Sequence, residues 1–307
     1  MMIVTKKVII VGGGPAGLTA ALYLARFHVS VILADAGQSR AELIACSHNQ
    51  PGCAGGISGP DLLRRMRNQV RQYGIELVQT DVRKIRNEEG RFVIQHGEVA
   101  IAAEAVLLAT GTRDRRPSMP NEVHTAALEN GTLRYCPICD GYEVTDKAVI
   151  VVGHGPRLLG EARFLRSFSS RVTVASESGN LGLSPAQYRQ LAELGVEVVD
   201  VPIVDYAAGS DFMDIGFADR VRRFDTLYVV MGSDAQSSLG AAAGAQTTPE
   251  GCLVVDRHQR TTVQGLYAAG DVTEGLDQIA VAIGQASIAA TAIRNDLCSE
   301  NPLLRQE

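Results

Sequence analysis

A glycine-rich segment near the start of the chain constrains its fold more than any other feature. Residues 8–11 are an apolar run typical of a buried strand, and the sequence Gly12-Gly13-Gly14-Pro15-Ala16-Gly17 follows directly. A helical apolar pattern and a second strand, which ends at Asp35, come next. Glycines in this order permit a tight turn, the approach of a pyrophosphate and close packing of the helix on the strand. We therefore predict a βαβ dinucleotide-binding unit in which Asp35 holds the ribose hydroxyls.

The same pattern recurs in the middle of the chain. A strand at residues 148–152 leads into Gly153-His154-Gly155-Pro156-Arg157-Leu158, and a helix and a strand at residues 172–175 follow. Two units of this kind form a degenerate internal repeat. The sequence therefore predicts an α/β fold with two Rossmann-like dinucleotide-binding domains.

Apolar periodicity predicts further elements around the two glycine loops. A helix is expected at residues 61–73, with its arginines, Arg67 among them, on the solvated side. The alanine-rich helix near the end of the chain, which includes Ile279 and Ile293, is expected to be close-packed. Strands are expected at residues 75–78, 81–85, 91–95, 98–101, 106–109, 227–230 and 266–272.

Between the two glycine loops stands the segment Cys136-Pro137-Ile138-Cys139-Asp140. One helical turn places residues i and i+3 side by side, within the Cα separation that a disulfide tolerates. Pro137 suits the first turn of such a helix, and Cys136 at its positive end is favoured as a thiolate. Asp140 is placed to carry protons to and from the sulfurs. In a chain without secretion signals this pattern indicates redox chemistry or a zinc site.

A zinc site needs two further ligands, and the other cysteines do not supply them in a typical spacing. Cys46 and Cys53 lie too far apart for a second Cys-x-x-Cys, so we expect no metal. They could form a second redox pair, although two isolated thiols is the commoner state. His48 between them is either a proton relay or a loop histidine with local partners.

The composition excludes several classes of function. The chain has 307 residues and a net charge of −5 that is spread along it, so neither nucleic acid nor an anionic membrane is an expected partner. The first residues lack the apolar core of a signal peptide, and no apolar run approaches the ~18 residues of a spanning helix. We expect a cytoplasmic protein whose cysteines are reduced by default.

The chain resembles the low-molecular-weight thioredoxin reductases from end to end. The resemblance depends on five motifs that follow one another along the chain. They are the first glycine loop, Ala109-Thr110-Gly111, the cysteine motif, the second glycine loop, and Ala269-Gly270-Asp271-Val272 with its closing helix. It implies an FAD domain made of residues 1–116 and 247–307, interrupted by a second nucleotide domain of residues 117–246 that carries the cysteines. It further implies a homodimer and a thiol or disulfide partner, either a protein such as thioredoxin or a small dithiol.

The resemblance also assigns roles to individual residues. Cys139 would lie on the flavin side, Cys136 would be the interchange thiol that meets the partner, and Asp140 would be the proton carrier. The residues expected around FAD are Gly12, Gly14, Pro15, Ala16, Gly17, Asp35, Asn49, Ala109, Thr110, Gly111, Gly270, Asp271 and Gln278.

The second glycine loop departs from the NADPH-dependent members of that family. They carry a small residue where this chain has Leu158, and arginines that grip the 2′-phosphate where it has Ala175-Ser176-Glu177-Ser178-Gly179-Asn180-Leu181. Arginine matches phosphate bidentately and Glu177 would repel it, so NADPH is not expected. Glu177 instead follows Gly155 at nearly the same distance along the chain as Asp35 follows Gly14. A carboxylate at that position suits a ribose whose 2′-hydroxyl is free. Gly153, Gly155 and Glu177 would then hold a second FAD or NADH; the other possibility is a loop that binds nothing.

A further departure concerns the flavin itself. Asp277 precedes Gln278 where reductases of this family commonly have an arginine, and a carboxylate there would disfavour an anionic reduced flavin. The sequence thus predicts an FAD-dependent disulfide or dithiol oxidoreductase that NADPH does not drive. An NAD(P)H-dependent thioredoxin reductase and a flavin-binding redox sensor are the alternatives.

Overall fold

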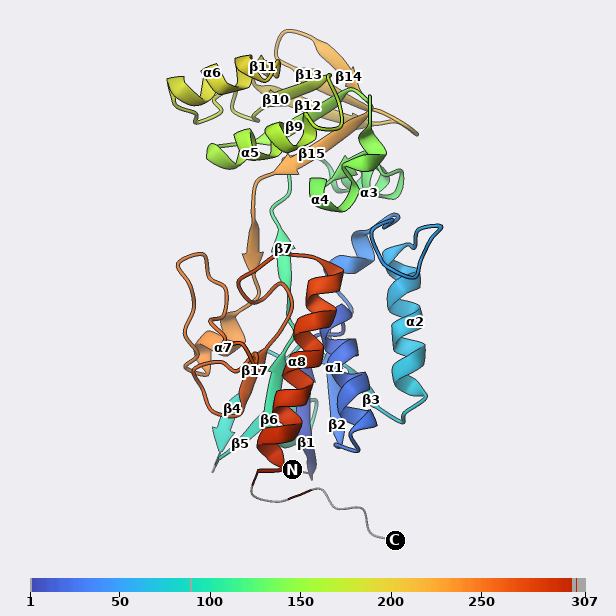
Figure 1. Ribbon diagram of the computed structural model, residues 1–307, viewed down its shortest axis with the longest axis vertical. Coiled ribbons are helices and arrows are strands. Elements are labelled where there is room, and N and C mark those ends of the chain that lie inside the picture. Colours follow the sequence, from blue (N-terminus) through green and yellow to red (C-terminus); the bar gives the residue numbers. More distant parts are fainter. Residues whose placement is uncertain (1, 89, 300–301, 303–307) are drawn as a thin grey trace. The chain divides into compact units, whose positions relative to one another are not determined.

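The computed structural model describes residues 2–88, 90–299 and 302, which fall into two compact units (Figure 1). Unit 1 contains Met1–Glu42, Gly59–Arg113 and Asp234–Glu307, and unit 2 contains Leu43–Ser58 and Asp114–Ser233. The long segment of unit 2 therefore ends before residue 246, where the sequence places the boundary. The segment of residues 43–58, expected in the first domain, belongs to unit 2.

Unit 1 is built on a seven-stranded sheet with the order β3-β2-β1-β6-β5-β4, in which β17 also pairs with β6. Strands β1, β2, β3, β6 and β17 run parallel, whereas β4 and β5 add an antiparallel hairpin. The strands are β1 Met2–Val11, β2 Val31–Asp35, β3 Glu76–Gln79, β4 Arg86–Glu88, β5 Arg91–His96, β6 Val99–Leu108 and β17 Leu266–Ala268.

Helices cover this sheet because its central strands are apolar on both faces. Helices α1 (Pro15–Arg26) and α8 (Ile279–Leu297) lie side by side, and α2 (Gly59–Arg71) packs against α1 (Figure 1). Alanines make up much of the buried stripe of α8, which permits this close packing. On the other face, Ile9 and Val11 of β1 join a core that includes Leu239 of α7 (Ser238–Ala242).

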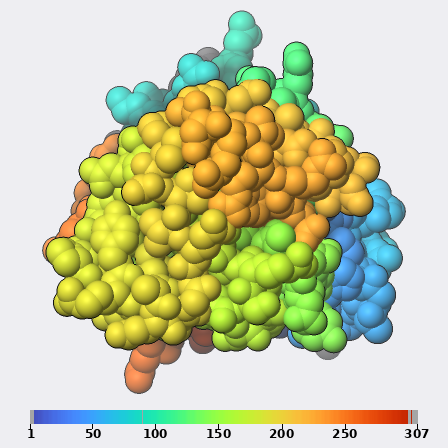
Figure 2. All heavy atoms as spheres, turned by 90° about the horizontal axis from the view of Figure 1, so that it is seen from above, coloured from blue at the N-terminus to red at the C-terminus, as the bar shows by residue number. Residues whose placement is uncertain are grey.

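Unit 2 repeats the parallel arrangement with the strand order β11-β10-β9-β15-β8 and adds an antiparallel sheet, β12-β13-β14. Figure 2 views this unit from above, where the yellow to orange atoms of residues near 185–230 form one continuous surface. The parallel strands are β8 Leu133–Arg134, β9 Val149–Gly153, β10 Val172–Ala175, β11 Glu197–Val199 and β15 Thr226–Val230. The antiparallel strands are β12 Ile203–Ala208, β13 Met213–Phe217 and β14 Val221–Phe224.

The remaining elements of unit 2 are short. Its helices are α3 Asn121–Glu129, α4 Pro137–Asp140, α5 Pro156–Leu165 and α6 Pro185–Glu193, and a 3-10 turn, η2, covers Tyr142–Val144. A second 3-10 turn, η1, covers Arg40–Leu43. Strands β7 (Thr112–Asp114) and β16 (Ser233–Ala235) pair with each other where the chain passes between the units.

Two expectations about local structure are wrong, and one sheet was not predicted. Residues 81–85 are all described and form no strand, because Val82 and Ile85 enter the core three positions apart rather than two. The strands expected at 98–101 and 106–109 are one continuous strand, β6. The antiparallel sheet of unit 2 was not expected, although Met213, Ile215 and Phe217 show the alternation of a half-buried strand.

Candidate active site

Cys136 and Cys139 form a disulfide, with their Cα atoms 5.3 Å apart. Pro137 begins the short helix α4 between them, so the two residues stand one turn apart as their spacing requires. The Cys139 N–H donates to the Cys136 sulfur (3.2 Å), which fixes the orientation of the first cysteine. Ile138 between them is half-exposed, so the motif presents an apolar side chain to solvent. The structure thus brings the two sulfurs together as a redox pair.

The carboxylate of Asp140 is held by two side chains from neighbouring strands. Arg134 of β8 contacts Asp140 Oδ2 through Nη1 (2.8 Å), and the Tyr228 hydroxyl of β15 donates to Asp140 Oδ1 (2.8 Å). Burial raises the pKa of Asp140, and the Arg134 charge and the Tyr228 hydrogen bond offset only part of that rise. A carboxyl whose pKa is raised above its ordinary value holds a proton more readily than a free carboxyl does, which suits a proton carrier.

Tyr228 and Arg134 are functional candidates that the sequence does not reveal. The Tyr228 side chain is 0% exposed, and burial together with the Asp140 carboxylate raises its pKa, so its hydroxyl stays a hydrogen-bond donor. Tyr228 also donates to the backbone oxygen of Asp140 (3.2 Å). These contacts form because β8 and β15 are adjacent parallel strands, in which Tyr228 pairs with Arg134.

In unit 1 the predicted cofactor residues gather at the carboxyl ends of the parallel strands. The Ala109 N–H donates to Val11 O (2.8 Å), and the Gly12 N–H donates to Ala34 O (2.8 Å), so the ends of β6, β1 and β2 are joined. A Cβ at Gly12 would collide with the Ala109 carbonyl, and one at Gly17 would collide with the Gly12 carbonyl. The turn therefore requires glycine at both positions, as a cradle for a pyrophosphate does.

Asp35 closes this cradle from the end of β2. Its Oδ1 accepts the Gly13 N–H (3.1 Å) and the Gly37 N–H (3.1 Å), which fix the carboxylate beside the glycine loop. Arg67 of α2 lies 3.7 Å from Asp35 Oδ2 and 3.0 Å from Glu42 Oε1. The expectation that Arg67 belongs to the solvated side of its helix is therefore wrong, because it neutralises charge at the cradle.

The final motif joins the same edge. Gly270 has a φ of 80°, and a Cβ there would stand 3.0 Å from the Ala16 Cβ, so the motif meets the start of α1 directly. Arg40 Nη1 lies 3.2 Å from Asp271 Oδ2 and 3.4 Å from Asp277 Oδ2. The Asp277 carboxylate thus has a cationic partner, which the sequence does not reveal.

The other predicted FAD residues divide between the units. Thr110 donates to Gln236 O (2.7 Å), Gly111 follows with a φ of 68°, and Gln278 precedes α8 as its N-cap. Asn49 belongs to unit 2, where its Oδ1 accepts a hydrogen bond from Ser47 (2.9 Å). The structure therefore assembles every predicted FAD residue except Asn49 within unit 1.

These residues fit a dinucleotide such as FAD. Because Gly12 and Gly14 have no side chains, there is room beside the N-terminus of α1, where backbone N–H groups favour a pyrophosphate. Asp35 offers carboxylate oxygens to a ribose, and Arg40 holds the Asp271 carboxylate. FAD bound there would supply a two-electron acceptor and donor.

The second glycine loop repeats this geometry only in part. A Cβ at Gly153 would collide with the Val230 carbonyl, and α5 begins at Pro156 as α1 begins at Pro15, but the N-cap Gly155 has a φ of 77° where Gly14 has −79°. Leu158 is 0% exposed and packs in the core of unit 2. The Gly155 N–H donates to Leu181 O (2.7 Å), and a Cβ at Gly182 would collide with the His154 ring. The core of unit 2 therefore accommodates the bulk of Leu158. The segment of residues 176–182 instead lies over the loop.

Glu177 is held by donors from the protein itself. Its Oε1 accepts the Ser118 N–H (2.5 Å) and the Tyr206 hydroxyl (3.1 Å), and its Oε2 accepts the Ser118 hydroxyl (3.1 Å). Tyr206 is buried, and burial together with the Glu177 carboxylate raises its pKa. Both carboxylate oxygens therefore already hold donors from unit 2.

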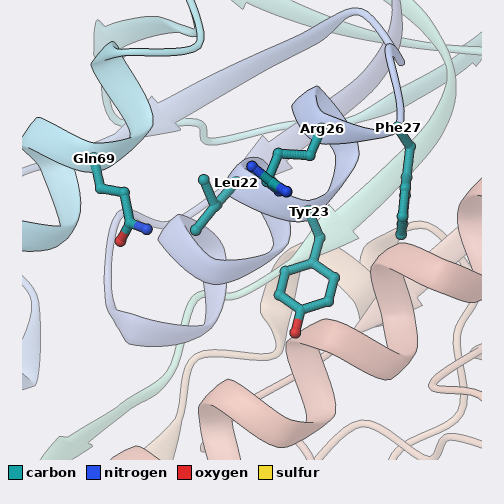
Figure 3. A pocket seen from close by; sticks show the side chains of 5 residues that line it. All are labelled: Leu22, Tyr23, Arg26, Phe27 and Gln69. Atoms are coloured by element: carbon teal, nitrogen blue, oxygen red, sulfur yellow. The ribbon is translucent and has the colours of Figure 1, made fainter. Parts of the chain in front are cut away.

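A hollow of about 300 Å³ lies between α1 and α2, apart from the predicted site residues. It is lined by Leu22, Tyr23, Arg26, Phe27 and Gln69 (Figure 3).

The described part of the chain has no group of three or more His, Cys, Asp or Glu side chains able to hold a metal. Within the same residues, no helix combines the length and the apolar character needed to cross a bilayer.

Comparisons with known proteins agree with this architecture. Residues 6–286 match the family model described as pyridine nucleotide-disulphide oxidoreductase. Thioredoxin reductase from Streptomyces coelicolor is 31% identical over 282 residues, which cover 88% of this chain and 86% of the relative. Thioredoxin reductase from Bacillus subtilis is 27% identical, with coverage of 94% and 93%. The crystal structure of thioredoxin reductase from Streptococcus pyogenes is 27% identical, covers 96% of this chain and 99% of its own, and has a TM-score of 0.87.

A disulfide beside a buried acid, together with a second unit that carries a dinucleotide cradle, defines a flavin-dependent disulfide oxidoreductase. The chain belongs to the pyridine nucleotide-disulphide oxidoreductase family and is of the thioredoxin reductase type, as its matched residues and its 31% identical relative show. It is accordingly an enzyme rather than a non-enzymatic redox sensor.

Proposed function

We propose that this enzyme exchanges electrons between FAD and a thiol or disulfide partner through Cys136 and Cys139, and that NADPH does not drive it. A partner dithiol attacks the Cys136 sulfur, which forms a mixed disulfide and releases Cys139 as a thiolate. The second partner thiol then releases Cys136 and leaves as a disulfide. Cys136 and Cys139 then close their disulfide again, and a bound FAD would accept the two electrons that this releases. The net half-reaction converts one dithiol and FAD into one disulfide and reduced FAD.

In this scheme Asp140 carries the two protons. Its raised pKa keeps it able to accept a proton from an attacking thiol and return it to a departing thiolate. Arg134 and Tyr228 are positioning residues that hold the carboxylate in one orientation. The reverse direction, reduction of a partner disulfide, uses the same groups. The partner is a protein such as thioredoxin or a small dithiol, and we propose a cytoplasmic homodimer.

One observation carries the proposed independence from NADPH: residues 176–182 close the second glycine loop. A nucleotide there must release the Gly155 N–H from Leu181 and must displace Glu177 from Ser118 and Tyr206. Hydrogen bonds to a charged group contribute about 1.5–3 kcal/mol each, so opening costs at least about 3 kcal/mol. A cost of that size weakens nucleotide binding by roughly two orders of magnitude.

The same closure argues against a second FAD or NADH in the loop. We propose one FAD per chain, which release of the cofactor from denatured protein and its quantitation against protein would measure. Titration of the holoenzyme with NADPH and NADH, followed by protein fluorescence, should show no saturable binding at micromolar concentration. Two flavins per chain, or saturation by either nucleotide, would count against the proposal.

A variant distinguishes a closed loop from a ribose site. Glu177→Ala releases Ser118 and Tyr206, so a closed loop should open more easily and bind NADH more tightly. If Glu177 instead holds a ribose, the same change should weaken binding. Glu193→Ala, which removes an exposed carboxylate at the end of α6 in the same unit, is the matched control. The alternative of an NAD(P)H-dependent thioredoxin reductase is favoured by the names of the relatives, and this titration tests it directly.

A further inference from the structure

Apart from the disulfide, one free thiol contacts a histidine, and that histidine contacts a carboxylate. Cys46 is exposed, and its sulfur lies 3.7 Å from His48 Nε2. His48 Nδ1 lies 3.0 Å from Glu143 Oε1. All three residues belong to unit 2.

Local backbone structure explains why Cys46 and His48 face the same way. Ser47 between them forms a two-bond antiparallel bridge with Ile57, with its N–H 2.8 Å from Ile57 O and the return bond at 2.9 Å. Side chains alternate along such a bridge, so the side chain of Ser47 is buried while Cys46 and His48 both lie on the opposite side.

Gly56 makes room for this pair. It has a φ of 76°, and a Cβ there would stand 2.6 Å from the Cys46 sulfur and 2.8 Å from His48 Nε2. Any side chain at this position would push the sulfur and the imidazole aside. The glycine therefore permits the approach of the thiol to the ring.

Glu143 fixes the histidine ring. It lies in η2, four residues after Cys139, and its side chain is 23% exposed. An Nδ1–H that donates to Glu143 leaves Nε2 as the acceptor that faces the thiol. Thiol, imidazole and carboxylate in this order are the arrangement that activates cysteine nucleophiles, because the base takes the thiol proton and the acid stabilises the resulting imidazolium.

We propose that Cys46 is a second reactive thiol of this enzyme, activated by His48 and Glu143, and that it reacts with low-molecular-weight disulfides. The Cys46 thiolate attacks one sulfur of R–S–S–R, a Cys46–S–S–R bond forms, and one RS⁻ leaves with the proton that His48 received. The small disulfide is the oxidant and Cys46 the reductant. This site is separate from the flavin–disulfide exchange and does not depend on whether NADPH is used.

The other free cysteines lack this arrangement. Among the described residues, no histidine lies within hydrogen-bonding distance of Cys53, Cys252 or Cys298. Burial, with the nearby Asp277 and Glu274 carboxylates, raises the pKa of Cys252, so its thiol stays protonated. These three cysteines are internal references for the reactivity of Cys46.

The test is the site of S-thiolation in the holoenzyme. The full chain, with Cys136–Cys139 oxidised, is incubated with glutathione disulfide at neutral pH and the modified cysteines are quantified by peptide mass spectrometry. We expect Cys46 to react at least about ten times faster than each of the other three, and His48→Gly to remove most of that advantage. Added imidazole should restore the rate in His48→Gly, which a merely structural role of His48 would not allow.

Two further variants complete the test. Glu143→Gln should slow the reaction several-fold, and Glu143→Asp should recover part of it. His258→Ala changes a partly exposed histidine elsewhere and should leave the rate unchanged. Far-UV circular dichroism and an intact Cys136–Cys139 disulfide confirm that each variant is folded, and if His48→Gly does not fold, Glu143→Gln carries the test. Equal rates at the four cysteines, or a variant at position 48 that reacts at the wild-type rate, would overturn the proposal.

Discussion

Replacement of Tyr228 by phenylalanine should move the Asp140-dependent limb of the pH–rate profile to higher pH. The Tyr228 hydroxyl donates to Asp140 Oδ1 at 2.8 Å from a position that is 0% exposed, so no water replaces it. That bond favours the ionised carboxylate. Its loss therefore adds to the rise in pKa that burial already causes, while Arg134 continues to oppose it.

The expected size of the shift follows from the two protonation states. A hydrogen bond to a charged group contributes about 1.5–3 kcal/mol and one to a neutral group about 0.5–1.5 kcal/mol. The ionised form of Asp140 thus loses about 1–1.5 kcal/mol more than the protonated form, and one pKa unit corresponds to about 1.36 kcal/mol. We expect a shift of roughly one pH unit upward.

The assay is the rate constant for anaerobic flavin reduction by a dithiol, measured from about pH 5 to about pH 9. Asp140→Asn identifies the limb that belongs to this carboxyl, because it should abolish that limb. Tyr206→Phe is the matched control: it also removes a buried hydroxyl from a carboxylate in unit 2, but that carboxylate is Glu177. A limb that stays in place in Tyr228→Phe, or moves to lower pH, would refute the reasoning.

Three further outcomes are expected. Gly17→Ala should lose most of its bound flavin on purification, because a Cβ at Gly17 collides with the Gly12 carbonyl, whereas Gly160→Ala, with open space around its Cβ, should retain it; equal flavin content would contradict the cradle. Arg40→Met leaves the carboxylates of Asp271 and Asp277 without their cationic partner, which should disfavour the reduced flavin. A redox titration should then show a flavin midpoint potential lower by about 20 mV for each kcal/mol of lost charge compensation. An unchanged or higher potential would count against this role of Arg40. Glu177→Gln should lower the free energy of unfolding in urea by about 1–2 kcal/mol, because it weakens the bonds to Ser118 and Tyr206; no loss would mean that these bonds do not hold the loop.

Local sequence signals predicted the parts of the fold that depend on neighbouring residues. The glycine loop at Gly12 requires its glycines for reasons that act within one βαβ unit, and the Cys136–Cys139 pair needs only one helical turn. Both are therefore visible in the sequence. The α/β class with two dinucleotide folds follows from the same local patterns.

The parts that could not be predicted depend on residues far apart in the chain. Tyr228 reaches Asp140 across 88 positions, because β15 lies between β9 and β8 in the sheet. Arg40 reaches Asp277 across 237 positions, so the charge at Asp277 looked uncompensated in the sequence. Spacing after a glycine loop also says nothing about which donors surround a carboxylate, so the bonds of Glu177 to Ser118 and Tyr206 could not be predicted.

The central claim is that electrons reach the flavin through the disulfide and not from NADPH. Its most direct measurement is the absorbance of the bound flavin under anaerobic conditions after addition of NADPH, NADH or a dithiol, in the wild type and in Cys139→Ser. We predict that only the dithiol bleaches the wild-type flavin, and that no reagent bleaches it rapidly in Cys139→Ser. Rapid bleaching of the wild-type flavin by stoichiometric NADPH would contradict the account.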